Sequence, residues 1–195
     1  EKAVEIARRG LQIHGGVGYT KEYGAERLLR ESIAMPIYEG TSQIQALMAM
    51  KDTLGTAIKN PQEFVKRVAQ AKWRSVSARD TLERRVAKLL SNTLAAEQHL
   101  LSRTATDKLR ALTKEPLAAW PQAFKKSWDP KRDFAYAMLH AERLIKLLSD
   151  STIAEILFAQ AQRHPERREV LERFLPPVQA AIDRLLPEMQ RAEII

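Results

Sequence analysis

The sequence predicts an all-α protein, and three observations support that fold class. All seven glycines lie within residues 1–55, and eight of the nine prolines lie beyond residue 60. The 140 residues after position 55 contain no glycine and are rich in Ala, Leu, Arg and Glu, which is typical of helices that end at prolines. Apolar residues recur at helical spacing, and no segment of convincing length predicts a strand.

The N-terminal part of the sequence predicts three helices. Residues 1–14 carry apolar side chains at helical spacing and end at a pair of glycines, which suits a helix C-terminus. A short helix is expected over residues 24–32 and a longer one over residues 42–55, with Thr41 as its N-cap. Because the chain starts inside a helical pattern and without Met, we expect that more protein precedes residue 1.

The motif NPQE predicts the start of the next helix. Asn60 suits the N-cap, Pro61 suits the first turn, and Glu63 is expected to reach back to the cap. An apolar face then continues to about residue 113 before further prolines end it. The members of this face are Phe64, Val68, Leu82, Val86, Leu89, Leu90, Leu94 and Leu101.

The motif WDPKRD repeats this start pattern, with Asp129 as the cap and Pro130 at the first position. The helix is expected to run to about His164 and to end at Pro165. The pair Pro176-Pro177 is expected to divide the remaining residues into two shorter helices. The tryptophans are expected to be core or interface anchors, and they are Trp73, Trp120 and Trp128.

Charge divides the chain at nearly the same place as glycine. Residues 1–50 hold six Lys/Arg and six Asp/Glu, so the net charge of +8 lies entirely in the rest of the chain. We therefore expect two domains, residues 1–55 and residues 56–195. The absence of cysteine excludes a disulfide framework, and the absence of eighteen consecutive apolar residues excludes a membrane span.

The stretch IYEGTSQIQ places a single carboxylate, Glu39, between a tyrosine and a glycine just before a predicted helix start. One explanation is ordinary, because an acid there favours the positive end of the helix dipole. The other is a catalytic base, since burial among apolar neighbours raises the pKa of a carboxylate. These neighbours are Ile33, Met35, Ile37 and Tyr38.

Polar groups follow this acid directly. Gly40 leaves room for a ligand to approach the backbone. Thr41, Ser42 and Gln43 offer amides and polar side chains at a helix N-terminus, where anions and polar ligands bind readily. This stretch therefore predicts a binding site around the candidate base.

The segment QIHGGVGYTKEY contains a second candidate site. Its glycine pair, Gly15-Gly16, is explained by a helix stop alone as readily as by a binding role. As a phosphate cradle the pair is a weak signal, because the G-x-G-x-x-G order and a preceding strand are missing. His14 is expected to be a packed or capping histidine. No His, Cys or acid lies at ligand spacing from it, so we predict no metal site.

Taken together, the two motifs make the N-terminal part of the sequence similar to a known family. Residues 11–45, LQIHGGVGYTKEYGAERLLRESIAMPIYEGTSQIQ, closely resemble the C-terminal helical domain of the acyl-CoA dehydrogenase family, and the likeness covers about residues 1–55. The sequence departs from the family's usual pattern at two places. Gly24 stands where proline is common, and RES over Arg30–Ser32 replaces the frequent Arg-Asp-Ala. Both departures lie outside the expected contacts.

The resemblance implies that a flavin accepts hydride from the β-carbon of an acyl-CoA thioester while Glu39 removes the α-proton. It implies that Gly40 lies against the substrate and that Thr41, Ser42 and Gln43 contact FAD. It further implies that a segment near residue 14 reaches the FAD pyrophosphate and adenosine, often across a subunit interface. That segment consists of Gln12, Ile13, His14, Gly15 and Gly16.

The resemblance also implies the setting of the reaction. We expect fatty acid β-oxidation, a homodimer or homotetramer, and an electron-transferring flavoprotein as acceptor. The expected location is the bacterial cytoplasm or the mitochondrial matrix, with possible peripheral membrane contact. Residues 56–195 are expected to form an additional C-terminal helical domain, and this chain alone is expected to be inactive.

Residues 56–195 are basic, and this charge is compatible with several kinds of binding partner. Residues 59–88 hold nine Lys/Arg against three acids, and FKKSWDPKRD adds a second basic group beside aromatic residues. A solvated helical face that packs on the bundle or a partner subunit is the ordinary explanation. An anionic membrane or the phosphates of CoA would also suit the charge, with Arg79, Arg84 and Arg85 as candidate phosphate partners. Nucleic acid is the partner we expect least.

Two other functions remain open at this stage. The chain could be a non-catalytic helical interaction or membrane-docking module in which the family's sequence motifs have only a structural role. It could also belong to a flavin-binding relative that performs different chemistry. Glu39 distinguishes them, because a scaffold has no need for an acid in an apolar setting.

Overall fold

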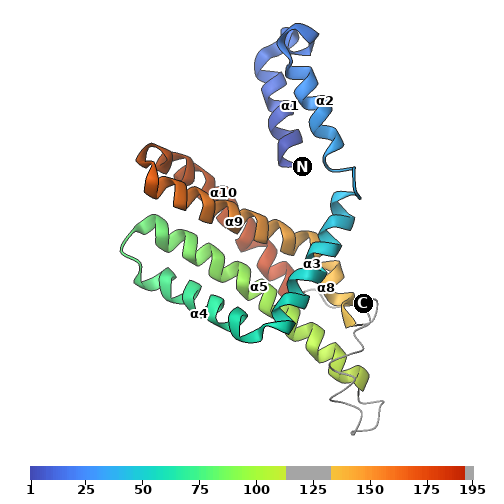
Figure 1. Ribbon diagram of the computed structural model, residues 1–195, viewed down its shortest axis with the longest axis vertical. Coiled ribbons are helices and arrows are strands. Elements are labelled where there is room, and N and C mark those ends of the chain that lie inside the picture. The colour runs from blue at the N-terminus through green and yellow to red at the C-terminus, as the bar shows by residue number, and fades with distance from the viewer. Residues whose placement is uncertain (113–132, 192–195) are drawn as a thin grey trace. The chain divides into compact units, whose positions relative to one another are not determined.

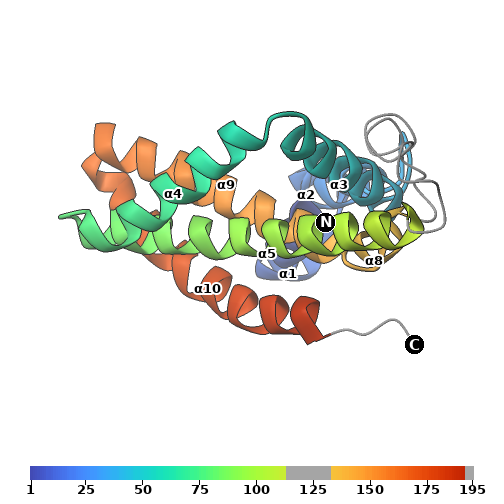
Figure 2. The same cartoon turned by 90° about the horizontal axis from the view of Figure 1, so that it is seen from below.

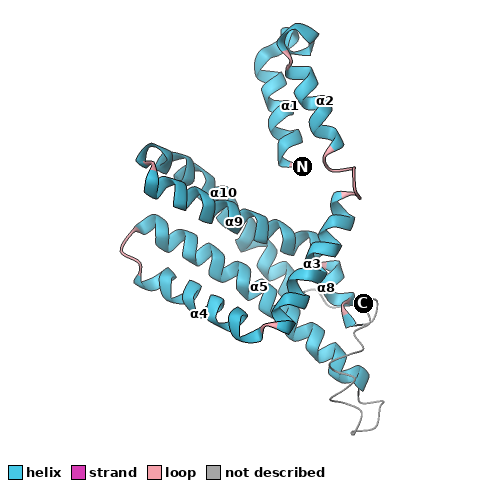
Figure 3. Cartoon of the chain, viewed as in Figure 1, coloured by secondary structure: helices cyan, strands magenta, loops and turns pink. Residues whose placement is uncertain are grey.

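The computed structural model describes residues 1–112 and 133–191, and these residues form helices without any strand (Figure 3). The all-α fold class is therefore confirmed for the described residues. The chain divides into two compact units, residues 1–48 and residues 49–195. The assignment of residues 1–55 and 56–195 to separate domains stays a prediction.

The first unit is a helical hairpin. Its arms are α1 (Lys2–His14) and α2 (Ala25–Ala34), and the 3-10 turns η1 (Gly15–Tyr19) and η2 (Lys21–Tyr23) join them. The arms lie side by side in opposite directions (Figure 1). The predicted helices are thus confirmed, and α1 ends at Gly15 with φ 66°, a left-handed conformation that glycine adopts without strain.

The turn of this hairpin requires a glycine at its centre. Gly18 is buried, and a Cβ placed on it would lie 2.6 Å from the Cβ of His14 and 2.9 Å from the carbonyl oxygen of Leu11. Because both contacts involve the preceding helix, no side chain fits there without moving the backbone. Gly18 therefore allows the turn to fold closely against the end of α1.

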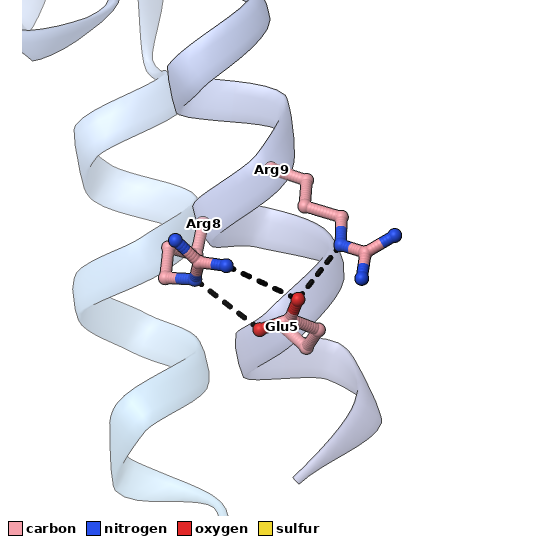
Figure 4. Close-up of polar contacts among 3 residues, drawn as sticks. All are labelled: Glu5, Arg8 and Arg9. Atoms are coloured by element: carbon pink, nitrogen blue, oxygen red, sulfur yellow. Dashed lines mark hydrogen bonds and ion pairs between the residues drawn. The ribbon is translucent and has the colours of Figure 1, made fainter.

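Ion pairs along one helix supplement this packing. Arg8 and Arg9 donate hydrogen bonds from their Nε atoms to the carboxylate of Glu5, at 3.2 and 2.7 Å (Figure 4). The hydrogen bonds from Arg8, followed by that from Arg9, lower the pKa of Glu5 to about 2. Because all three side chains are exposed, water screens the pairs and their effect on stability is small.

The first unit buries few side chains. Its buried residues are Gly18, Ala25, Ser32 and Ala46, all of them small. Many of its large apolar side chains are exposed, among them Ile6, Ile13, Val17, Leu28, Ile33, Met35, Ile37 and Met48. The hairpin therefore has almost no hydrophobic core of its own.

Helix α3 (Ser42–Lys59) leads into the second unit, where α4 (Pro61–Ser77) begins at the predicted position. The capping expected there is wrong. The side chain of Asn60 makes no capping hydrogen bond, and the Asn60 N–H donates to the carbonyl oxygen of Thr56 at 2.9 Å. That bond already uses the amide that Glu63 was expected to reach.

The apolar face expected to continue to residue 113 is divided by a turn. Ala78 adopts an extended conformation with ψ 137°, and α5 (Thr81–Leu112) begins after it. Asp80 stabilises the new helix start, because its Oδ1 accepts the Leu82 N–H at 2.9 Å. The same carboxylate accepts two hydrogen bonds from Arg168, at 2.8 and 3.0 Å, and these chiefly lower its pKa.

The turn folds α4 back along α5, as Figure 2 also shows. Buried Ala71 of α4 packs with Leu90 and Leu94 of α5, and Phe64 and Val68 cover that cluster. Most of the predicted apolar face is therefore confirmed as core. Trp73 is not part of this core, because 70% of its surface is exposed, and its role as an interface anchor stays a prediction.

The last part of the described chain contains α8 (Ala135–Leu139), α9 (Ala141–Arg163), the turn η4 (Pro165–Arg167) and α10 (Arg168–Arg191). The predicted helix end near His164 is confirmed, although a break at His140 separates α8 from α9. The helix start at Asp129 and Pro130 lies outside the described residues, as do Trp120 and Trp128.

The expected division at Pro176-Pro177 is wrong, because α10 continues through both prolines and through Pro187. Each proline removes a backbone hydrogen bond, but the apolar face is buried on both sides of the pair. Its buried residues are Leu171, Leu175, Val178, Ile182, Leu185 and Met189. This packing offsets the missing hydrogen bonds. No helix among the described residues has the length and apolar character needed to cross a bilayer.

Candidate functional site

Glu39 lies in the segment between α2 and α3, and its backbone is unusual. Its φ of 57° is the only positive value at a non-glycine residue in the described chain. A side chain in this left-handed conformation costs about 1–2 kcal/mol. The amide Nε2 of Gln45 donates a 2.5 Å hydrogen bond to the carbonyl oxygen of Glu39. The first turn of α3 thus holds the strained residue in place.

Gly40 continues the unusual backbone path with a φ of 109°. A Cβ on this residue would lie 3.3 Å from Cγ2 of Ile44, which is tighter than an ordinary contact. The Ser42 N–H donates to the carbonyl oxygen of Pro36 at 3.2 Å and closes the segment into a compact turn. Glycine is therefore required at position 40 by its conformation and by the space available.

The burial of Glu39 that the sequence led us to expect is not provided by this unit. Glu39 is exposed, and its four apolar neighbours are exposed as well. The exposed fractions are 46% for Ile33, 57% for Met35, 61% for Ile37 and 62% for Tyr38. Residues 1–48 therefore leave these apolar neighbours of Glu39 in the sequence uncovered.

The start of α3 presents polar groups next to this acid. The carbonyl oxygen of Thr41 accepts the Gln45 N–H at 2.9 Å, and its Oγ1 accepts the Ile44 N–H at 3.5 Å. The predicted N-cap is thus confirmed, with a long side-chain bond. The side chains of Thr41 and Gln43 are exposed and Ser42 is half-buried. The positive end of the helix and these groups suit an anionic or polar ligand.

The second predicted cluster occupies the last turn of α1. The side chains of Gln12, Ile13 and His14 are exposed, and Ile13 is 85% exposed. The space beside Gly15 and Gly16 is open, since nothing lies within 4 Å of a Cβ built on either. His14 Nδ1 lies 2.9 Å from the carbonyl oxygen of Gly10, so this histidine bonds to its own helix, as expected. No group of three or more potential metal ligands occurs in the described ranges.

The two clusters lie at opposite ends of the hairpin in Figure 1. The ten residues of α2 separate them, a length of about 15 Å. The structure therefore brings Glu39 and Gly40 together with the start of α3. It does not bring Gln12–Gly16 to the same place within one chain.

Gln45 is the site residue that sequence reasoning missed. It lies six positions after Glu39, outside the spacing of any simple capping pattern, and its side chain reaches back over the turn. Its only signal in the sequence is its place at the end of the quoted motif. The left-handed conformation of Glu39 had no signal, because glutamate rarely adopts it.

Comparison with known proteins bears on this first unit most strongly. Residues 1–54 match the family described as acyl-CoA dehydrogenase, C-terminal domain. A 3-methylmercaptopropionyl-CoA dehydrogenase from Ruegeria pomeroyi is 33% identical over 119 residues, which cover 57% of this chain and 20% of that protein. A probable acyl-CoA dehydrogenase from Bacillus subtilis is 50% identical over 54 residues, 28% of this chain and 14% of that protein.

A subunit of a caffeyl-CoA reductase-Etf complex from Acetobacterium woodii is 52% identical over 44 residues, 23% of this chain and 12% of that protein. No solved structure matches the chain. The chain thus spans a fifth or less of the length of these relatives. The Ruegeria match covers more of the chain than residues 1–54 supply, so it includes part of the second unit.

Proposed function

We propose that this chain is the C-terminal part of an FAD-dependent acyl-CoA dehydrogenase, because residues 1–54 form a C-terminal acyl-CoA dehydrogenase region. The observation that carries the proposal is the geometry of Glu39. Its strained backbone is fixed by Gln45, and Gly40 leaves the adjoining backbone without a side chain. Strain of this kind is concentrated at functional sites, where it sets the direction of a reacting group.

The proposed role of Glu39 is that of a general base. Its carboxylate takes the proton from the α-carbon of the thioester, and the electron pair of that bond becomes the new double bond as hydride leaves the β-carbon. FAD, when bound, supplies the acceptor for that hydride. Gly40 is the proposed substrate contact, since it carries no side chain of its own that would hold an acyl chain away from the backbone.

A base of this kind needs an environment with little water. The exposed apolar side chains around Glu39, such as Ile37 and Tyr38, supply one wall of it. We propose that parts of the complete protein outside residues 1–48 cover this wall and desolvate the carboxylate. On this proposal the present chain holds the base without the rest of the pocket, so it is inactive alone.

Two sets of residues fit FAD by their chemistry. Thr41, Ser42 and Gln43 offer hydroxyl and amide groups at a positive helix end. Gln12–Gly16 offers exposed polar side chains and open backbone that a pyrophosphate can approach. Because the sets lie at opposite ends of the hairpin, we propose that they serve two different FAD molecules in a homodimer or homotetramer.

The proposed setting follows from the same family. An electron-transferring flavoprotein is the proposed acceptor, supported by the relative that is named as a subunit of an Etf complex. Fatty acid β-oxidation in a bacterial cytoplasm or a mitochondrial matrix is the proposed context. In the second unit, the exposed Arg79, Arg84 and Arg85 are consistent with a solvated basic face.

A docking role for the second unit is a further candidate, favoured by the outer face of α4. Trp73 and Val76 are 70% and 73% exposed there, beside the exposed Lys72. Exposed aromatic and basic side chains on one helix suit a protein partner or an anionic membrane surface. This role is compatible with the enzyme and does not replace it.

The test of the enzyme is a visible absorption spectrum of the full-length protein that contains this chain. We expect a flavin band in the blue that bleaches when an acyl-CoA is added. In Glu39→Gln we expect the band to remain and the bleaching rate to fall by roughly 10²–10⁴-fold, the usual worth of a general base. The matched control is Glu22→Gln, which removes an exposed acid from the hairpin turn.

Each contrary result identifies a different error. A colourless protein that does not bind added FAD would show that the family's motif has only a structural role here. A Glu39→Gln variant that bleaches as fast as the unchanged protein would show that another group is the base.

A further inference from the structure

A groove in the second unit is not explained by the proposed enzyme. It has a volume of about 420 Å³ and is lined by the C-terminal half of α3, the start of α4 and the middle of α5. Its polar lining includes Asp52 and Thr56 of α3, Glu63 and Arg67 of α4, and Glu97 of α5. A groove of this volume accommodates a small organic molecule.

Glu97 is the unusual member of this lining. Its side chain is only 3% exposed, and it lines the groove. Within residues 1–112 and 133–191, no group donates a hydrogen bond to its carboxylate and no cation lies within ion-pair distance. A carboxylate that is largely removed from water and has no such partner is costly in its ionised form.

The other polar side chains of the groove are also available to a ligand. Asp52, Thr56 and Glu63 form no side-chain hydrogen bond with any described residue, and neither does Arg67. Three carboxylates therefore face one guanidinium in a protein whose net charge is +8. This local excess of acid favours a cationic occupant over an anionic one.

We infer that the groove binds a small organic ammonium ion, whose charged nitrogen pairs with the Glu97 carboxylate and whose apolar part packs on Phe64 and Ala57. Phe64 is half-buried and Ala57 is buried, so both present apolar surface at the groove wall. The ring of Phe64 also attracts a cation at its face. A metal ion is not the proposed occupant, because no cluster of three suitable ligands occurs in the described ranges.

Proton binding supports this assignment. Burial raises the pKa of Glu97 to about 7, and the charge of Arg67 opposes that rise. The other charged groups that face the groove are Asp52 from α3 and Glu63 from α4. Because an ammonium ion pairs with the ionised carboxylate, its affinity follows the ionised fraction. That fraction rises about tenfold between pH 6 and pH 8 for a pKa near 7.

The experiment is calorimetric titration of the chain of 195 residues with butylammonium chloride at pH 6 and pH 8. We expect saturable binding at one site, about tenfold tighter at pH 8. Butan-1-ol, which has the same carbon chain without the charge, is expected not to bind. Absence of saturable binding at pH 8, or equal binding of the alcohol, would overturn the inference.

Two variants locate the site. Glu97→Gln keeps the shape of the side chain and is expected to weaken binding at pH 8 by at least about tenfold. Glu142→Gln, which removes an exposed acid from α9, is the matched control and is expected to change nothing. Thermal unfolding of each variant establishes that it is folded. Unchanged affinity in folded Glu97→Gln would place the ligand elsewhere.

A variant at Arg67 is expected to change the affinity for butylammonium in the opposite direction. Arg67→Gln removes the cation that the described residues supply to the groove, and at pH 8.5 it is expected to tighten butylammonium binding at least about twofold. Inorganic phosphate is the complementary probe, and we expect it not to bind. If phosphate binds and Arg67→Gln abolishes that binding, the groove is an anion site and the inference is wrong.

Discussion

At the scale of single residues, Gln45 determines how Glu39 is held. Its amide bonds the carbonyl oxygen of a residue in a left-handed conformation, so its loss lets the backbone of Glu39 relax. In the full-length protein, we expect Gln45→Ala to lower kcat by about tenfold, while KM and flavin content change little. Gln45 is thus a positioning residue.

The measurement is a comparison of kcat and KM with those of Gln70→Ala, which removes an exposed amide from α4. A general loss of stability would lower flavin content in proportion to activity. A kcat equal to that of the control would mean that the turn holds Glu39 without this hydrogen bond.

Glu97 gives a second prediction at this scale, which concerns stability. Its pKa is raised to about 7 in the folded protein because burial disfavours the charged form, with an opposing effect of Arg67. The stability that this residue contributes is therefore complete below its unfolded pKa of 4.5 and is lost as pH rises through about 7. The loss is about 3 kcal/mol on the usual conversion.

Urea unfolding of the chain at pH 4.5 and pH 8 measures this effect, with Glu97→Gln as the reference. The difference in unfolding free energy between the two proteins is expected to move in favour of the variant as pH rises. A difference that stays constant across this interval would mean that Glu97 titrates normally.

At the scale of helices, one buried ion pair ties distant segments together. Lys108 of α5 donates a 3.0 Å hydrogen bond to Asp133, which lies just before α8, and both side chains are 0% exposed. Asp133→Asn removes the charge that faces the Lys108 ammonium at a fully buried position, so we expect it to destabilise the protein by about 3–5 kcal/mol. The control is Glu169→Gln, which breaks the exposed pair with Arg173 and is expected to cost less than about 1 kcal/mol.

Chemical denaturation of the two variants provides the comparison. Equal small losses would mean that water reaches the Lys108 ammonium when its partner is neutral. A large loss in Glu169→Gln would contradict the weak value assigned to exposed pairs.

The helices also show where sequence patterns succeed and where packing overrides them. The ends at Gly15 and Arg163 were predictable because glycine and proline act locally on the backbone. The continuous α10 was not, because the effect of Pro176-Pro177 depends on which side chains are buried beside it. The turn before Asp80 was missed for a similar reason, since the partner that stabilises it, Arg168, lies 88 positions away.

The candidate site shows the same division. Residue identities predicted the acid, the adjoining glycine and the polar start of α3, because these are neighbours in the sequence. The path of the backbone was not predictable, since the conformation of Glu39 depends on the side chain of Gln45. The exposure of Glu39 was not predictable either, because burial is a property of packing and not of apolar composition.

At the scale of the whole molecule, the two units differ in their capacity to fold. The second unit contains fully buried Leu54, Leu94, Leu144, Leu171 and Ile182. The first unit buries only small residues and leaves most of its large apolar side chains in water. Burial of apolar surface is the main favourable contribution to folding, and two short helices without it are marginal.

We therefore expect a polypeptide of residues 49–195 to unfold cooperatively on heating, as judged by circular dichroism at 222 nm. A polypeptide of residues 1–48 is expected to show little helix and no cooperative transition. Because several of these exposed apolar side chains flank Glu39 in the sequence, this prediction also bears on the proposed enzyme. A hairpin that needs another surface to fold holds its base in a site that only that surface completes. Cooperative melting of residues 1–48 alone would contradict both parts of this argument.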